Sequence, residues 1–150
     1  MSQKLSEATS SWMQANGYDP EKLNQRGENG DSALMIAARE GKIEVVKELI
    51  EAGADVNHKN DDNNNALWPA CRSENTEIIE LLIAAKTDMD NQNANGSTAL
   101  MYAASAGKDR VVRLLLQYNA NPNLKNFDDF RAIDLASTGE VLGMLKNVTN

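Results

Sequence analysis

The sequence predicts an all-α protein in which a pair of short antiparallel helices is repeated and stacked into a solenoid. Two recurrences support this fold. An Ala-Leu pair stands at 33–34, 66–67 and 99–100, a step of 33 residues. The same step relates the apolar pairs at 45–46, 78–79 and 111–112, without any insertion. A fixed period of this size is typical of repeat architectures, in which each unit is one supersecondary element.

The first helix of each unit is expected to follow a capping residue. Ser32, Asn65 and Thr98 precede the Ala-Leu pairs, and side-chain oxygens of these residue types accept hydrogen bonds from the first helical turn. Small residues then follow, such as Ala37-Ala38, which allow a neighbouring backbone to approach closely. Gly41 supplies the turn into the second helix.

The second helix of each unit carries one apolar stripe. In the first repeat, Val45, Val46, Leu49 and Ile50 occupy positions i, i+1, i+4 and i+5, the spacing of one helical face. The later repeats keep this pattern. A single unit cannot bury such a stripe, so stacked neighbours are expected to share a core.

The middle unit is the most irregular. Asn63, Glu74 and Lys86 stand where glycine would be expected. Asn tolerates the left-handed conformation, whereas Glu74 and Lys86 predict local strain or an altered turn. Pro69 lies early in the first helix of this unit and is expected to distort that turn.

Both ends of the chain are expected to cap a single repeat domain. Leu5, Ala8 and Trp12 are predicted to share one face of a helix, with Met13 beside them. Gly17 and Pro20 then end that helix. The predicted division is an N-terminal capping unit at 1–23, repeats at 24–59, 60–92 and 93–125, and a truncated C-terminal capping repeat at 126–150.

The stretch GDSALMIAAREGKIEVVKELIEAGADVN resembles an ankyrin repeat, whose signature includes Thr-Pro-Leu-His-x-Ala, a turn glycine and a Gly-Ala-Asp-Val-Asn ending. GSTALMYAASAGKDRVVRLLLQYNANPN matches nearly as well, and the resemblance covers roughly residues 24–147. It implies β-turn loops that project to one side of the helix pairs. The chain departs from the family where its proline is alanine in every unit and its histidine becomes Met35, Trp68 and Met101.

Composition narrows the classes of function. The net charge is −7, which disfavours nucleic acid, since phosphate binding needs a Lys/Arg patch. An acidic surface can instead steer a basic partner. No apolar run is long enough for a membrane span, and the N-terminus does not resemble a secretory signal. We therefore expect a monomeric, cytoplasmic protein that does not bind membranes.

Reactive groups are scarce. His58 and Cys71 are the only residues of their types, so they cannot form a metal or catalytic cluster. We expect His58 to be an exposed loop residue and Cys71 to be a buried packing residue. The runs at 61–65 and 88–91 lack the glycine and glutamate of an EF-hand loop. No enzyme activity, cofactor or metal is expected.

The resemblance implies a concave binding surface made of the loop tips and the exposed side of each first helix. Trp68 could instead pack between first helices, and we leave both roles open. Tyr102 favours binding, whereas capping of the last unit is slightly favoured for Phe127 and Phe130. The predicted partner-binding residues are Glu28, Asn29, Asp31, Ile36, Arg39, Glu40, Asp61, Asp62, Asn64, Trp68, Arg72, Ser73, Asn95, Ser97, Tyr102, Ser105, Phe127, Asp128 and Phe130.

The predicted function is binding of another protein, with a basic surface on that partner as one possibility. The alternative is an inhibitor or immunity-type protein that blocks a basic enzyme or toxin. Tight, salt-sensitive, one-to-one binding to a basic enzyme would favour the alternative. Fold alone does not decide between them, because stacks of one fold bind unrelated targets.

Overall fold

A computed structural model describes residues 4–150, and the chain divides into two compact units. The first unit ends at Thr87, and the second extends from Asp88 to Asn150. Over the described residues the regular elements are helices, with no strand. The predicted all-α fold is therefore confirmed.

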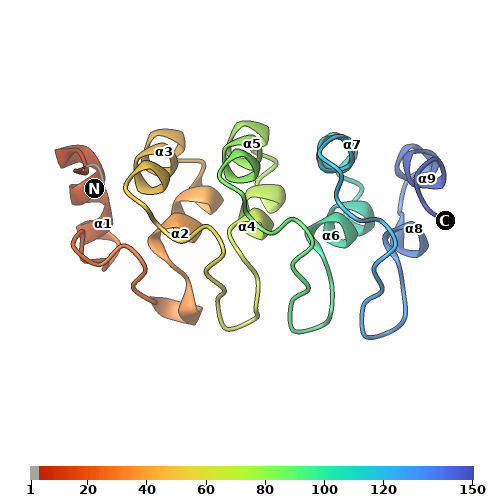
Figure 1. Ribbon diagram of the computed structural model, residues 1–150, viewed down its shortest axis with the longest axis horizontal. Coiled ribbons are helices and arrows are strands. Elements are labelled where there is room, and N and C mark those ends of the chain that lie inside the picture. Colours follow the sequence, from red (N-terminus) through yellow and green to blue (C-terminus); the bar gives the residue numbers. More distant parts are fainter. Residues whose placement is uncertain (1–3) are drawn as a thin grey trace. The chain divides into compact units, whose positions relative to one another are not determined.

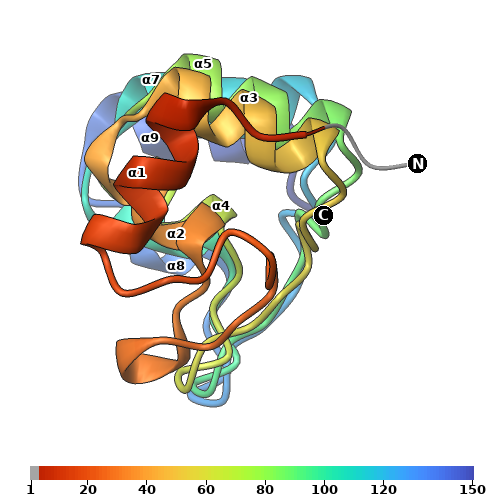
Figure 2. The same ribbon diagram turned by 90° about the vertical axis from the view of Figure 1, so that its left-hand side faces the viewer.

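The first unit contains two helix pairs and an N-terminal helix (Figure 1). α2 packs on both α3 and α4, α4 packs on α5, and α3 packs on α5 and on α1. Figure 2 shows α3 and α5 in one layer above α2 and α4, with the loops beyond them. The helices are α1 (Glu7–Ala15), α2 (Ala33–Glu40), α3 (Ile43–Glu51), α4 (Leu67–Arg72) and α5 (Thr76–Ala84), with a 3-10 turn η1 (Glu28–Gly30) in the first loop.

The second unit contains two further helix pairs, in which α6 contacts α7 and α8, and α9 contacts α7 and α8. The last pair is shortened, since α8 has only 4 residues. Thr138 caps α9, and Val141 and Leu145 of that helix are fully buried. The helices are α6 (Ala99–Ser105), α7 (Asp109–Gln117), α8 (Ala132–Leu135) and α9 (Gly139–Lys146).

The predicted helix caps are confirmed in two repeats. Ser32 Oγ accepts from the Met35 N–H at 3.3 Å, and Thr98 Oγ1 accepts from the Met101 N–H at 3.2 Å. Asn65 instead accepts from the N–H of Leu67, where α4 begins. α4 begins one residue later in the repeat than α2 and α6, because Pro69 has no N–H to give to Asn65 O, the bond that Ile36 and Tyr102 make in the other repeats. The expected distortion is present.

The apolar stripes form the core. Val46 and Leu49 of α3, and Ile78, Ile79 and Leu82 of α5, are all fully buried. Burial of each such side chain stabilises the fold by about 1.5–3 kcal/mol. The stripe of α7 is buried in the same way. Stripe burial within stacked helix pairs is what the 33-residue period predicts.

The irregular middle repeat keeps its turns. Asn63, Glu74 and Lys86 have φ angles of 60°, 56° and 72°, the left-handed conformation that Gly41 adopts with φ 73°. An altered turn at Glu74 or Lys86 was therefore the wrong alternative. Strain is the correct one, because a side chain in this region costs about 1–2 kcal/mol.

The predicted helix face of Leu5, Ala8 and Trp12 is not formed as expected. Thr9 and Met13 are the buried residues of α1, whereas Ala8 is exposed and Leu5 precedes the helix. The reason is a capping arrangement that sets the rotation of α1. Ser6 caps the helix, and the Thr9 hydroxyl donates to a carboxylate of α3. Thr9 and Met13 therefore turn inward together.

Candidate functional site

The tip of each long loop is closed by an asparagine. Asn60 Oδ1 accepts from the backbone N–H groups of Asp62 and Asn64, both at 3.0 Å. Asn93 and Asn126 do the same in the next two loops. These asparagines stand 33 residues apart, so the period could have identified them, but they were absent from the predicted site. They hold the exposed tip residues in a fixed conformation.

Neighbouring loops within a unit are also bridged. The Asp61 N–H donates to Asn29 O at 2.9 Å, and the Phe127 N–H donates to Asn95 O at 3.0 Å. Side chains add a second bridge in the first unit, where Arg26 donates to Lys59 O and pairs with Asp61 at 2.8 Å. These bonds hold both the backbone and the carboxylate of Asp61 in place.

A hollow of about 530 Å³ opens on the first unit between the loop tips and the sides of α2 and α4. We call it the first-unit hollow. It brings together residues from two loops and two helices, and its lining mixes apolar, amide and charged groups. The lining residues are Asn29, Asp31, Met35, Arg39, Asn60, Asp62, Asn64, Trp68, Pro69, Arg72 and Ser73.

One acid of the first-unit hollow is part of the scaffold. Asp31 is only 5% exposed, which contradicts its predicted place on an exposed loop tip. Its carboxylate accepts from Asn60 Nδ2 at 2.9 Å and pairs with Arg39 at 3.5 Å. The Tyr18 hydroxyl donates to Asp31 O at 2.7 Å, and burial, followed by the nearby Asp31 charge, raises the pKa of Tyr18. The contacts from Asn60 and Arg39 satisfy the Asp31 carboxylate, a charge that would otherwise be costly to bury.

Two other charges of the hollow have no partner within the described chain. The Arg72 guanidinium and the Asp62 carboxylate are both exposed and make no ion pair or side-chain hydrogen bond with any described residue. The Asn64 side-chain oxygen is a buried acceptor without a donor. Trp68 is 8% exposed, so most of its ring is packed while part of it lines the hollow. The arrangement offers an anion, a cation and an acceptor around an aromatic side chain.

A smaller hollow of about 220 Å³ adjoins this surface and shares Asn29, Asp31 and Arg39 with it. Together the two hollows contain every predicted first-unit residue except Asp61, which pairs with Arg26. Asn16, Tyr18, Met35, Asn60 and Pro69 line them without having been predicted as site residues. The predicted residues found only in the smaller hollow are Glu28, Ile36 and Glu40.

The predicted residues of the second unit lie on two loops and one helix. Asn95 and Asp128 are exposed tip residues, while Ser97 and Tyr102 are half-buried. Ser105 is exposed and donates to Tyr102 O at 3.0 Å.

The predicted capping role for the two phenylalanines is wrong. Phe127 and Phe130 are 77% and 47% exposed, so neither folds under the last unit. The loop turns them outward, since its backbone is closed through Asn126 and needs no side chain for packing.

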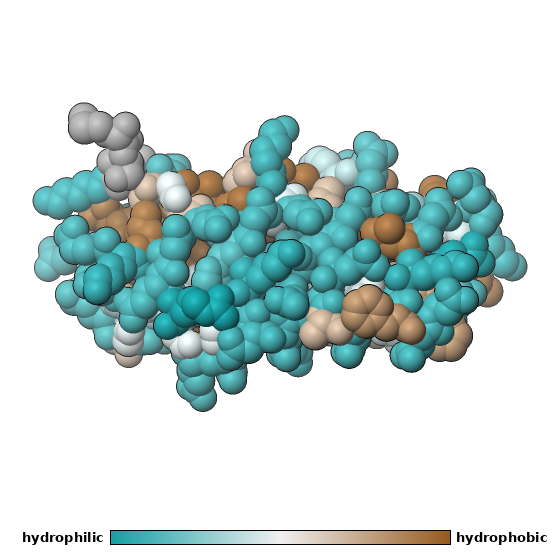
Figure 3. All heavy atoms as spheres, turned by 60° about the horizontal axis from the view of Figure 1, so that its bottom comes forward, coloured by the Kyte–Doolittle hydropathy of each residue, from teal (hydrophilic) through white to brown (hydrophobic). Residues whose placement is uncertain are grey.

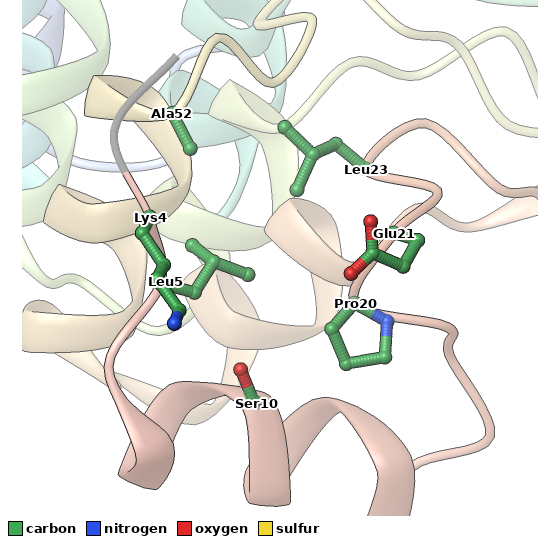
Figure 4. Close-up of a pocket in the computed structure, with 7 residues that line it drawn as sticks. All are labelled: Lys4, Leu5, Ser10, Pro20, Glu21, Leu23 and Ala52. Atoms are coloured by element: carbon green, nitrogen blue, oxygen red, sulfur yellow. The ribbon is translucent and has the colours of Figure 1, made fainter.

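A third hollow of about 380 Å³ lies at the N-terminal helix. Figure 4 shows Leu5 and Leu23 pointing into the same space from the two sides, with Glu21 nearby. Lys4, Ser10, Pro20 and Ala52 complete its lining. Its side chains do not form a cluster of polar groups aimed at one point.

The histidine and the cysteine of the chain both have structural surroundings. His58 is half-buried, not exposed as expected, because its Nε2 lies 2.8 Å from Gly30 O. Cys71 is buried as predicted. Among residues 4–150 no three His, Cys, Asp or Glu side chains gather in a way that could hold a metal ion. Within the same residues, each helix is too short or too polar to cross a bilayer.

Stacked helix pairs with loops that extend to one side define a helical repeat protein. The chain belongs to the ankyrin repeat family, whose model for ankyrin repeats matches residues 2–93, 34–126 and 67–146. Ankyrin repeats are generally protein–protein interaction modules.

One human relative shares part of the sequence. Ankyrin repeat domain-containing protein 31 of Homo sapiens is 46% identical over 41 residues, which are 27% of this chain and 2% of that protein. The chain thus matches only a very small part of that relative's length.

Proposed function

We propose that this chain binds another protein through the first-unit hollow and the loop tips. The observation that carries the proposal is the pair of unpartnered charges, Arg72 and Asp62, which line a hollow together with Trp68. Neither charge has a described structural partner. A partner that supplies opposite charges would gain charge-assisted hydrogen bonds, which are about twice as strong as neutral ones.

The rigidity of the surface supports the same proposal. Asn60 holds the tip that carries Asp62 and Asn64, and the Ser73 hydroxyl lies 3.3 Å from Ala38 O and ties α4 to α2. A preformed surface loses little conformational entropy on binding.

The proposed partner has a surface that is at least partly basic. The chain carries 22 acidic and 15 basic residues, and this excess speeds encounter with basic partners. We further propose a monomer in a reducing cytoplasm, which suits a single buried cysteine, and neither nucleic acid nor membrane as a partner.

Affinity capture from the native source with mass spectrometry tests the proposal. Wild-type chain and the Arg72→Ala variant serve as baits, and Arg110→Ala is the matched control, since Arg110 is exposed on α7 and lies outside the hollow. A protein retained by wild type and Arg110→Ala but lost with Arg72→Ala supports the proposal. Equal recovery on all three baits contradicts it.

The captured protein also separates scaffolding from inhibition. A basic enzyme or toxin bound one-to-one, with affinity that falls steeply as salt rises, would support the inhibitor or immunity reading. A partner without enzyme activity, retained at high salt, would favour an interaction module.

A further inference from the structure

Two large apolar side chains are exposed to solvent on the last loop of the second unit. Phe127 is 77% exposed and Phe130 is 47% exposed. Figure 3, which brings the loop tips forward, shows an apolar group among largely hydrophilic atoms on this part of the loop face. Exposed apolar side chains that cluster are typical of interaction sites.

The loop does not need aromatic residues at these positions. Ala94 and Asp61 occupy the positions equivalent to Phe127, one and two repeat steps earlier, and Ser97 and Asn64 are equivalent to Phe130. In every case the loop is closed by the same backbone bonds, Asn60 N–H to Asn64 O, Asn93 N–H to Ser97 O and Asn126 N–H to Phe130 O. Small or polar residues therefore occupy these positions in the other loops, which are closed without an aromatic side chain.

Phe127 is nonetheless held in place. Its N–H donates to Asn95 O at 3.0 Å, and its ring lies against Gly96, where an added Cβ would be 2.7 Å from Phe127 Cδ1. The other side of the ring faces solvent. An aromatic side chain seated in this way presents a large apolar area at little entropic cost on binding.

The charges beside the ring indicate the kind of partner. Asp129 pairs with Lys125 at 3.5 Å, whereas the Asp128 carboxylate is exposed and makes no ion pair with a described residue. Lys125, Asp128 and Asp129 together carry one net negative charge next to the two aromatic residues. A second copy of this chain would bring Asp128 toward Asp128 against a net charge of −7 on each molecule, which opposes self-association.

We propose that Phe127, Asp128 and Phe130 form a docking surface, the aromatic loop patch, for a protein segment that carries an exposed apolar side chain beside a lysine or arginine. The apolar side chain packs on the Phe127 ring, and the cation pairs with Asp128. This inference rests on the proposed protein-binding function and adds the chemistry of one contact to it.

Selection from a phage-displayed library of short random peptides tests the patch, with the full chain as the target. We expect enriched peptides to carry an apolar residue next to Lys or Arg. Their affinity should fall at least about tenfold in Phe127→Ser or Phe130→Ser, as for an aromatic anchor. An Asp128→Lys variant should lose the basic peptides and select acidic ones instead.

Controls keep the outcomes distinct. Because both rings are exposed, the variants should melt like wild type by circular dichroism. Peptides that bind the Arg72→Ala variant as well as wild type but fail with Phe127→Ser support the patch, whatever the fate of the first-unit hollow. Peptides lost with Arg72→Ala and kept by both Phe variants overturn this inference while leaving the proposed function intact. Absence of any enriched peptide also overturns it.

Discussion

The backbone N–H of Ser6 donates to the Glu48 carboxylate at 2.7 Å, which joins the start of α1 to the middle of α3. The Ser6 and Thr9 hydroxyls donate to the second carboxylate oxygen at 3.0 and 2.8 Å. One acidic side chain thus satisfies three donors at the N-terminus of a helix, where a negative charge is also favoured by the helix dipole.

Replacing Glu48 should loosen the N-terminal helix. We expect Glu48→Ala to lower the free energy of unfolding by about 1 kcal/mol, the usual cost of losing helix-capping hydrogen bonds. Denaturant unfolding measures this cost. Glu44→Ala is the control, because that exposed glutamate pairs only with Lys47 and should cost about 0.5 kcal/mol or less. Equal losses in the two variants would contradict the account.

The same contact should make stability depend on pH. The hydrogen bond from the Ser6 backbone, and then those from the Thr9 and Ser6 hydroxyls, hold the pKa of Glu48 below its ordinary value of 4.5. The stabilisation is therefore complete above pH 4.5 and is lost as pH falls through the lowered pKa. Wild type should lose more stability in that window than Glu48→Ala. Parallel curves would show that the carboxylate is not bonded in solution.

A second pH effect of opposite sign is expected at Glu140. A hydrogen bond with Asp109, and then repulsion by its charge, raise the pKa of Glu140 above 4.5. Stability from this group is present below pH 4.5 and falls as pH rises to the raised pKa. Glu140→Gln should therefore match wild type in acid and unfold at a higher temperature at neutral pH. A lower melting temperature at neutral pH would be inconsistent with this pairing.

A substitution should relieve the backbone strain at Lys86. Its φ is 72°, and the equivalent position one repeat earlier is Gly53. We expect Lys86→Gly to raise the free energy of unfolding by about 1 kcal/mol, because glycine adopts this conformation freely. Lys86→Ala removes the same exposed side chain while keeping the Cβ, so it should bring no gain. A gain in both variants would assign the effect to the lost charge.

The shared core should be sensitive to a single cavity. Leu82 of α5 is fully buried, whereas Leu142 of α9 is 36% exposed. Leu82→Ala should lower the free energy of unfolding by about 2–5 kcal/mol, and Leu142→Ala should cost clearly less. Thermal unfolding followed by circular dichroism gives both values. A small effect at Leu82 would mean that the stripe of α5 is not packed.

Much of the fold could be predicted because a pattern found in one repeat recurs at the same positions in the others. Ser32 and Thr98 cap their helices as predicted, and the stripes of α3 and α5 are buried except for Val45, Ile50 and Ile83, which are half-buried. The cap at Asn65 shifted because Pro69 removed a donor. The rotation of α1 could not be predicted, since it depends on Glu48, a partner from a distant part of the chain.

The sequence predicted where the candidate site lies, but it did not predict which of its side chains are exposed. Most predicted first-unit residues line one of two adjoining hollows, because equivalent positions in a repeat lie on one surface. Burial of Asp31 depends on a contact across loops with Asn60, and exposure of Phe127 depends on a loop that is closed through Asn126. A single residue's type does not reveal such contacts.

The central claim is that recognition uses the first-unit hollow, so the most direct measurement is the affinity of the captured partner by isothermal titration calorimetry. Wild type is compared with Arg72→Ala, Asp62→Ala and the double variant, each with its melting temperature. We predict that the double variant binds at least about tenfold more weakly, or about 1.4 kcal/mol, while its melting temperature stays close to that of wild type. Unchanged affinity, or weaker binding accompanied by unfolding, would contradict the claim.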